Sequence, residues 1–397
     1  MSHDAPTLPA GPTKLVIENI GLLLSGDIDN PILDADTIVA VDGRIAAIGR
    51  AADLDLEGAT TRIDAHGSPL TPGLIDSHVH PVAGDWTPRQ NQIGWIESCL
   101  HGGVTTMISA GEVHTPGRPR DIVGLKAMAI SAQRQFENFR PGGVKVHAGA
   151  PAIEHGMVEE DFAELARAGV KQIGEVGLGS VKDAETARQM VAWARKYGMK
   201  SMTHTGGPSI AGSALIDKDV VLAADADVMA HINGGPTALP DDQIIALCKS
   251  CERGIEIVHN GNPRAAIVAL NTAREIGALS RVLLGTDAPA GSGVQPLGIL
   301  RTISLLCSIG GIPAEIAICF ATGNTARIRD LDCGLIEIGR SADFVLMDKP
   351  QQSAGATLLE AIALGDLPGI SMTVIDGIVR TGRSRNTPPA NTMAAVL

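Results

Sequence analysis

The sequence predicts an α/β protein in which a (β/α)8 barrel of the TIM type carries a small β-sandwich built from both chain ends. Two observations lead to this prediction. Eight short apolar runs alternate with helix-like stretches through the middle of the chain, and hairpin patterns recur near both ends. The composition fits a large globular core, because 44% of the 397 residues are hydrophobic and 19% are charged.

The first part of the chain has the pattern of β structure. The segment 37–49, TIVAVDGRIAAIG, contains two β-rich runs around an Asp-Gly pair, which is a strong hairpin signal. A similar unit, MTVIDGIVRTG, occupies 372–382, and 341–348 predicts a further strand. We expect residues 1–70 and 335–397 to form one sandwich, because two unrelated hairpins would each have little core of their own.

Residues 71–334 are expected to form the barrel. The candidate strands are 71–80, 103–111, 144–149, 172–179, 200–207, 227–235, 255–262 and 281–289. Helical spacing is clearest in 160–169 and 183–198, and Gly198 suits the position that follows a helix. Strands and helices alternating in this number predict a (β/α)8 barrel. A doubly wound open sheet is the competing fold, but no segment resembles its glycine-rich dinucleotide loop.

Charge and composition exclude several classes of protein. The 32 basic and 44 acidic residues give a net charge of −12, which disfavours nucleic acid and anionic membrane surfaces. No apolar stretch has the length of a bilayer span, and the N-terminus lacks a secretory pattern. The six scattered cysteines suit reduced thiols. We therefore expect a cytoplasmic enzyme with no nucleic-acid or membrane partner.

Ligand-type side chains gather at the predicted carboxyl ends of the strands. The first strand ends in a His-x-His pair, whose imidazoles can face the same way and hold one ion because side chains alternate along a strand. In a barrel all these ends converge on one face, where active sites of this fold lie. Histidine and carboxylate ligands suit divalent metals such as zinc. The six side chains are His78, His80, Glu175, His204, His231 and Asp287.

The remaining histidines have more ordinary explanations. His147 and His259 also lie on predicted strands, where a hydrogen-bonded core or surface role is the commoner one. His101, His114 and His155 fall in predicted helices or loops, and we assign them no metal role.

Several segments resemble the amidohydrolase superfamily: TPGLIDSHVH, the single histidines in THTGG and AHINGG, and the aspartate in GTDAP. The terminal hairpins match the composite sandwich of that superfamily, so the resemblance covers essentially the whole chain. The segments HGGVTTMISAG, GEVGLG, HINGGPTA, PLGILR and SRNTPPA are most similar to its enamidase branch.

This resemblance implies a centre of two divalent metal ions, with zinc as the expected metal and a mixed iron and zinc pair as the alternative. His78, His80 and Asp287 would hold the more buried ion, and His204 and His231 would hold the second.

A bridge between the two ions is also implied. Many relatives use a carboxylated lysine, whereas this chain offers Glu175, which resembles the enamidase arrangement. Lys145 is the alternative bridge, because it shares strand-face parity with His147.

The implied activity is hydrolysis of a cyclic amide, namely 6-oxo-1,4,5,6-tetrahydronicotinate to 2-formylglutarate and ammonia in nicotinate degradation. Asp287 would be the catalytic residue, taking a proton from the attacking water and returning it to the leaving nitrogen. Because this small heterocyclic substrate is an anion, a basic loop residue should anchor its carboxylate. Arg89, Arg118 and Arg264 are the candidates, and His147 is a candidate hydrogen-bond partner.

Two other functions stay open. One is another cyclic amidohydrolase or deaminase of the superfamily, of the hydantoinase, dihydroorotase or imidazolonase type. The other is a metal-free binding homologue that kept the fold. The resemblance and the apolar tail at 393–397 also predict a homo-oligomer, with a tetramer as the expected form.

Overall fold

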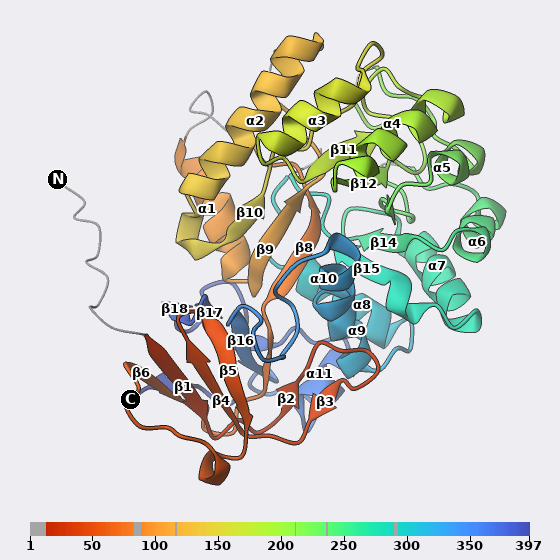
Figure 1. Ribbon diagram of the computed structural model, residues 1–397. Coiled ribbons are helices and arrows are strands. Elements are labelled where there is room, and N and C mark those ends of the chain that lie inside the picture. The colour runs from red at the N-terminus through yellow and green to blue at the C-terminus, as the bar shows by residue number, and fades with distance from the viewer. Residues whose placement is uncertain (1–12, 83–88, 116, 211, 236, 290–292) are drawn as a thin grey trace.

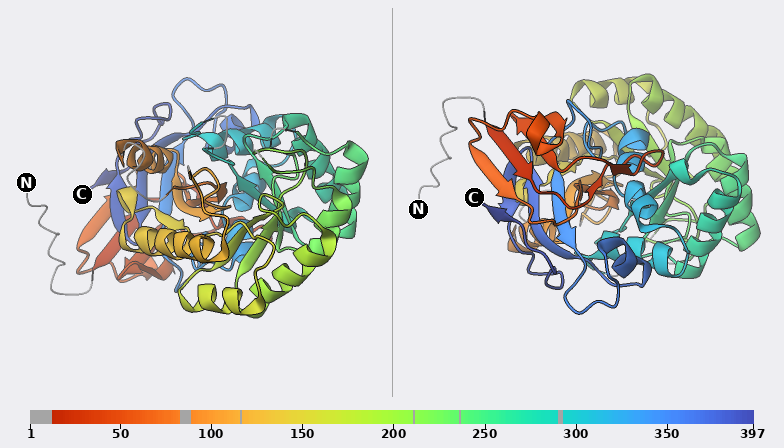
Figure 2. Two further views of the ribbon diagram at one scale, coloured as in Figure 1. Left: turned by 90° about the horizontal axis from the view of Figure 1, so that it is seen from above. Right: turned by 90° about the horizontal axis from the view of Figure 1, so that it is seen from below.

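The computed structural model describes residues 13–82, 89–115, 117–210, 212–235, 237–289 and 293–397, with the side chains of 89–93 outside the description. A region of parallel strands and helices lies beside two mixed sheets (Figure 1). Seen from above, the helices lie outside the parallel strands (Figure 2).

Seven of the eight parallel strands fall within the predicted segments and β14 begins one residue before its segment, which confirms the predicted alternation. The first sheet holds β8 (Leu74–Val79), β9 (Val104–Ser109) and β10 (Lys145–His147). The second sheet holds β11 (Gln172–Val176), β12 (Lys200–Thr203), β13 (Val228–Met229), β14 (Gly254–Val258) and β15 (Val282–Gly285). The two sheets meet where the N–H of Asp287, just beyond β15, donates to the carbonyl of His78 on β8 at 2.9 Å.

The helices between and after these strands cover the outer side of the parallel region. They are α1 (Arg89–Leu100), α2 (Ile122–Asn138), α3 (Glu159–Arg167), α4 (Ala184–Lys196), α5 (Lys218–Ala224), α6 (Asp241–Ser250), α7 (Pro263–Glu275), α8 (Gly298–Ser308), α9 (Ala314–Phe320), α10 (Gly323–Arg329) and α11 (Leu358–Ala363). Short 3-10 turns occupy Ala51–Asp53, Pro141–Gly143 and Leu279–Arg281. Among the described helices, none combines the length and the apolarity that crossing a bilayer requires.

Helix α4 illustrates why the predicted helices form. The Asp183 side chain accepts a hydrogen bond from the Thr186 N–H at 2.9 Å and caps the first turn. Gly198 adopts φ 74°, as expected of the residue after a helix. Between these ends, Met190 and Val191 bury the apolar face.

Two mixed sheets combine strands from both chain ends. One has the order β19-β6-β1-β4-β5 and the other β18-β17-β16-β7-β2-β3. From the N-terminal part come β1 (Lys14–Glu18), β2 (Leu23–Leu24), β3 (Ile32–Leu33), β4 (Thr37–Val41), β5 (Arg44–Gly49), β6 (Thr61–Asp64) and β7 (Leu70–Pro72). From the C-terminal part come β16 (Phe344–Asp348), β17 (Gly369–Ile375), β18 (Ile378–Thr381) and β19 (Ala395–Val396). Ile17 and Ile63 of one sheet share a buried cluster with Phe344 and Val374 of the other.

Both predicted hairpins are present, and their turns touch. Asp42 and Gly43 have φ of 48° and 77°, and Asp376 and Gly377 have φ of 52° and 71°. Positive φ at both central residues is the type I′ geometry that Asp-Gly favours. The Gly377 N–H donates to the Ala342 carbonyl and the Ala342 N–H donates to the Gly43 carbonyl, so the turns lie side by side.

The segment 71–80, which we expected as one strand, is divided. β7 ends and β8 begins on either side of Gly73. A Cβ at Gly73 would lie 2.2 Å from Thr105 Oγ1, so only glycine fits this close approach. β7 therefore pairs with β16 and β2, while β8 joins the parallel strands.

Candidate metal centre

The six predicted ligand side chains come together at the carboxyl ends of the parallel strands. His78 lies on β8 and Glu175 on β11, while His80, His204, His231 and Asp287 follow β8, β12, β13 and β15. All six side chains belong to buried residues, of which Asp287 is the most exposed at 7%. The convergence follows from the shared direction of the strands.

Glu175 lies between two pairs of histidines, and each of its oxygens faces one pair. Oε1 is 2.5 Å from His231 Nε2 and 3.3 Å from His204 Nδ1. Oε2 is 3.6 Å from His78 Nε2 and 3.6 Å from His80 Nε2. A carboxylate in this position can serve two cations at once.

Asp287 completes the half of the site that holds the His-x-His pair. Its Oδ1 lies 3.1 Å from His80 Nε2 and 3.6 Å from His78 Nε2. The backbone of Asp287 has φ 58°, which is uncommon outside glycine and often marks a functional position. The Asn260 side-chain amide donates to the Asp287 carbonyl at 2.7 Å and helps to hold this conformation.

The second ring nitrogen of each histidine is held by an acceptor outside the cluster. The carboxylate of Glu256 lies 2.7 Å from the second nitrogen of His78. Backbone carbonyls are the partners of the other three rings: Gly111 for His80 at 2.8 Å, Gly207 for His204 at 2.8 Å and Thr205 for His231 at 3.2 Å. A carbonyl only accepts, so the outer nitrogen of each of these three rings carries a proton, and the inward nitrogen presents a lone pair when the ring is neutral. Such outer partners are usual around metal-ligating histidines.

This arrangement fits cations. Inward lone pairs face the acceptor oxygens of Glu175 and Asp287, and such contacts are unfavourable unless a positive charge lies between them. His78 Nε2 is buried and has no hydrogen-bond partner among the described residues. Three sets have ligand atoms within 4.8 Å of one another: His78, His80 and Glu175; His78, His231 and Asp287; Glu175, His204 and His231.

The pKa values of the buried groups show how strongly the charges interact. Burial lowers the pKa of His78, but Glu256 and Glu175 outweigh it and raise the pKa well above its usual value. Burial raises the pKa of Glu175, and His231 and His78 outweigh it and hold the pKa well below its usual value. A bound cation would take over the role of the proton on His78.

Sequence reasoning missed three residues that support or border the site. Glu256 on β14 accepts from His78, from Ser77 Oγ at 2.7 Å and from Arg329 Nη2 at 3.2 Å. A glutamate within the apolar run IEIV was the available signal for Glu256. The ring of His114 lies 5.0 Å from that of His80, edge to face, and burial followed by the charge of His80 lowers its pKa to about 4. No sequence pattern marked His114 or Arg329.

The predicted arginines lie in different settings. Arg89 begins α1, and its side chain lies outside the described residues. Arg118 lies in the loop after β9, as His114 does, and its buried Nη1 has no hydrogen-bond partner among the described residues. Burial also lowers the pKa of the Arg118 guanidinium. Arg264 is 67% exposed on α7 and forms an ion pair with Asp241 at 2.6 Å.

The structure places His147 and Lys145 away from this cluster. His147 lines a separate cavity, and none of the six side chains of this cluster lines it. Lys145 Nζ lies 2.8 Å from Asp343 and 2.7 Å from Asp376. The carboxylate between the histidines is therefore that of Glu175, and Lys145 already has two partners.

Comparison with known proteins identifies the family. Residues 70–379 match the model of the amidohydrolase family. The enamidase of Eubacterium barkeri is 49% identical over 385 residues, covering 97% of this chain and 100% of that protein. A deacetylase of Agrobacterium fabrum is 28% identical over 353 residues, covering 81% of this chain and 80% of that protein. A crystal structure of enamidase superposes with a TM-score of 0.93 at 49% identity, covering 97% of this chain and 100% of that chain.

The chain therefore belongs to the amidohydrolase family, a family that uses divalent metal ions. The resemblance to enamidase inferred from the sequence is confirmed at the level of the whole chain.

Proposed function

We propose that the protein is a metal-dependent hydrolase that opens a cyclic enamide, 6-oxo-1,4,5,6-tetrahydronicotinate, and yields 2-formylglutarate and ammonia in nicotinate degradation. The observation that carries this proposal is Glu175, which turns one oxygen toward each pair of histidines. The identity of 49% to an enamidase over 97% of the chain supports the choice of substrate class.

The residues that would hold the metal ions are those of the cluster. His78, His80 and Asp287 would bind one divalent cation, His204 and His231 a second, with a bridge from the carboxylate between them. We propose zinc, with a mixed iron and zinc pair as the alternative, because imidazole and carboxylate ligands suit both metals. When bound, the ions would supply a water of lowered pKa and polarise the amide carbonyl.

Asp287 is the proposed catalytic acid and base. Its buried carboxylate would take the proton of the attacking water and return it to the ring nitrogen as the C–N bond breaks. The nitrogen then leaves as an enamine, which tautomerises to an imine. A second water converts the imine to the aldehyde and ammonia, so that two waters are consumed for each ammonia released.

Arg118 is the proposed anchor of the substrate carboxylate. It shares a loop with His114, whose ring contacts His80, and its Nη1 lacks a partner among the described residues. A charged group that is buried without a partner is costly, and a carboxylate would satisfy it with a charge-assisted hydrogen bond. Arg264 is paired with Asp241 and exposed, so it is the weaker candidate, and Arg89 stays a prediction.

The proposal places the site in a (β/α)8 barrel formed by residues 71–334, with 1–70 and 335–397 forming the composite sandwich. The backbone bonds that join the segments after β15 and β8 support closure of the barrel. The sheets that mix strands from both chain ends support the sandwich.

The test combines metal analysis with activity. We expect the purified protein to contain two divalent ions per chain and to release ammonia from 6-oxo-1,4,5,6-tetrahydronicotinate. Hydantoin, dihydroorotate and imidazolone propionate serve as the comparison panel. Turnover of one of these in place of the lactam would favour a related amidohydrolase, and protein that takes up no metal would favour a binding homologue.

The assembly and the location of the protein stay predictions. We expect a homo-oligomer, with a tetramer as the expected form, in the cytoplasm. Sedimentation at micromolar concentration that gives only a species of 41.0 kDa, the mass of one chain, would contradict the oligomer.

A further inference from the structure

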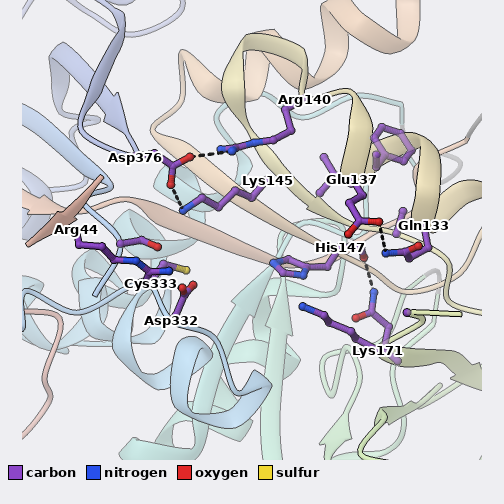
Figure 3. A pocket seen from close by; sticks show the side chains of 16 residues that line it. Arg44, Gln133, Glu137, Arg140, Lys145, His147, Lys171, Asp332, Cys333 and Asp376 are labelled. Carbon is purple, nitrogen blue, oxygen red and sulfur yellow. Dashed lines mark hydrogen bonds and ion pairs between the residues drawn. The ribbon is translucent and has the colours of Figure 1, made fainter. Parts of the chain in front are cut away.

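A cavity of about 300 Å³ lies along β10 and at the amino-terminal end of β11, and none of the six side chains of the metal cluster lines it (Figure 3). Within the described sheets, β10 and β11 form no ladder with each other. The Gln172 side chain instead donates to the His147 carbonyl across the gap. The cavity opens beside this break, between Lys145, which begins β10, and Lys171, which precedes β11.

The two hairpins singled out in the sequence also reach this cavity. Arg44 follows the first Asp-Gly turn and Asp376 belongs to the second, and both line the cavity. A neighbouring cavity of about 260 Å³ shares His147, Lys171 and Asp332 with the first. The two cavities therefore adjoin each other at these residues, and together they are called the recess below.

The lining holds more basic than acidic side chains, although the protein has a net charge of −12. Two of these cations, Lys145 and Arg329, are also paired with Asp343 and Glu256 just outside the lining. Among the described lining residues the cations are Arg44, Arg140, Lys145, Lys171, Lys200 and Arg329. The carboxylates are Glu137, Asp330, Asp332 and Asp376. A local field of this sign inside an acidic protein favours anions.

The ion pairs among the described lining residues do not include two of the lysines, Lys171 and Lys200. Asp376 contacts Lys145 at 2.7 Å and Arg140 at 2.8 Å, and Asp332 contacts Arg44 at 2.7 Å. The remaining cations include Lys171, which is exposed, and Lys200, which is half-buried, and neither ammonium group has an ion-pair or hydrogen-bond partner among the described residues. The carboxylate of Asp330 in the same lining has no described partner either. Arg329, at 5% exposure, adds a buried Nη1 that has no described partner.

The ring of His147 lies at the centre of the recess (Figure 3). Burial lowers its pKa to about 4, and the charges of Lys171 and Lys145 act in the same direction. The imidazole is therefore neutral at physiological pH and offers an N–H donor without a charge of its own.

We propose that this recess binds a small dianion, a dicarboxylate or a phosphate, between Lys171, Lys200 and His147. Two unpaired ammonium groups favour a ligand with two negative charges, and the neutral imidazole adds a hydrogen bond. The proposal goes beyond the hydrolysis described above and does not depend on it, because these residues lie outside the metal cluster.

The test is calorimetric titration of the zinc-loaded protein with glutarate and, separately, with inorganic phosphate in a buffer free of other multivalent anions. We expect saturable binding of at least one of them with a millimolar or lower Kd. The double variant Lys171→Gln/Lys200→Gln should weaken this binding about tenfold or more, since two charge-assisted contacts are lost. Lys249→Gln, an exposed lysine on α6, is the matched control and should leave the Kd unchanged.

A second variant should change the affinity for the anion in the opposite direction, which a loss of folding would not do. Asp332→Asn removes a negative charge from the lining and should tighten binding about two- to fivefold. Glutarate alone binding would identify a dicarboxylate site, and phosphate alone would identify a phosphate site. Absence of saturable binding, or equal binding by the double variant and the wild-type protein, would overturn the proposal, the latter because the anion would then lie at the metal centre.

Discussion

The two ends of the parallel strands both collect charged side chains, but they pair them in different ways. At the carboxyl ends, Glu175 faces histidine nitrogens whose ring protons are already held elsewhere. At the amino ends, Lys145 lies between Asp343 and Asp376 at 2.8 and 2.7 Å, so its charge is already balanced. The first arrangement places two carboxylates among four imidazoles and suits metal cations. The second keeps spare ammonium groups and suits an anion.

Two buried glutamates also differ because of the side chains that surround them. Glu112 accepts from Ser109 Oγ at 3.1 Å and from the N–H groups of Gly149 and Ala150, and burial raises its pKa to about 7. Glu175 is equally buried, yet its histidine neighbours hold its pKa well below the usual value. Burial alone therefore does not mark a metal ligand, whereas the identity of the neighbours does.

The largest effect is expected at Asp287, the proposed catalytic carboxylate at the carboxyl ends of the strands. Asp287→Asn keeps the shape of the side chain but removes its basicity, so turnover should fall by about 10²–10⁴ while metal occupancy falls only in part. Turnover per bound metal and the melting temperature should be measured on the same sample. Near-normal turnover per metal together with a lowered melting temperature would contradict the catalytic role.

Replacing the proposed bridge, Glu175, should affect the metal content differently from replacing Glu112. Glu175→Gln should lose at least one metal ion, because a neutral amide cannot balance two cations. Glu112→Gln should keep both ions and lower the stability by about 1–3 kcal/mol, since a buried hydrogen bond is lost. Metal analysis and thermal unfolding of both variants make the comparison. Two metals and full activity in Glu175→Gln would mean that the bridge lies elsewhere.

The buried ion pair between Arg329 and Glu256 should contribute more to the free energy of unfolding than an exposed ion pair does. Arg329 and Glu256 are both buried, and Arg329→Met would leave Glu256 with His78 as its remaining charged partner. We expect a loss of about 3–5 kcal/mol in the free energy of unfolding. Arg167→Met, which breaks an exposed pair with Glu160, is the control and should cause no measurable change. Equal denaturant midpoints for the two variants would refute this ranking.

The smallest effect is expected at the proposed substrate anchor. Arg118→Met should raise KM for the carboxylate-bearing lactam about 10- to 100-fold with little change in kcat. KM for the same lactam without its carboxylate should stay the same. Arg264→Met, whose arginine is paired with Asp241, is the control. An equal rise in KM for both lactams would assign Arg118 a structural role instead.

Much of the fold was predictable because its signals are local. The Asp-Gly turns at Asp42 and Asp376 and the end of α4 before Gly198 depend on neighbours a few residues away. The division of the first barrel strand at Gly73 was not predictable, because it depends on the approach of Thr105 from the next strand. At the candidate site, the six ligand-type residues could be predicted from the sequence, and the direction of the strands brings their side chains together.

By itself, the sequence determined the alternation of strands and helices, the hairpins at both ends and the ligand-type residues at the strand ends. Periodicity and turn chemistry specify these features over a few residues. Only the tertiary structure decided which nitrogen of each histidine faces inward, that Lys145 is bound to Asp343, and that β10 and β11 part to leave a recess. These features depend on long-range partners, such as Arg329 and Ser77, which are 252 positions apart and meet only when the chain is packed.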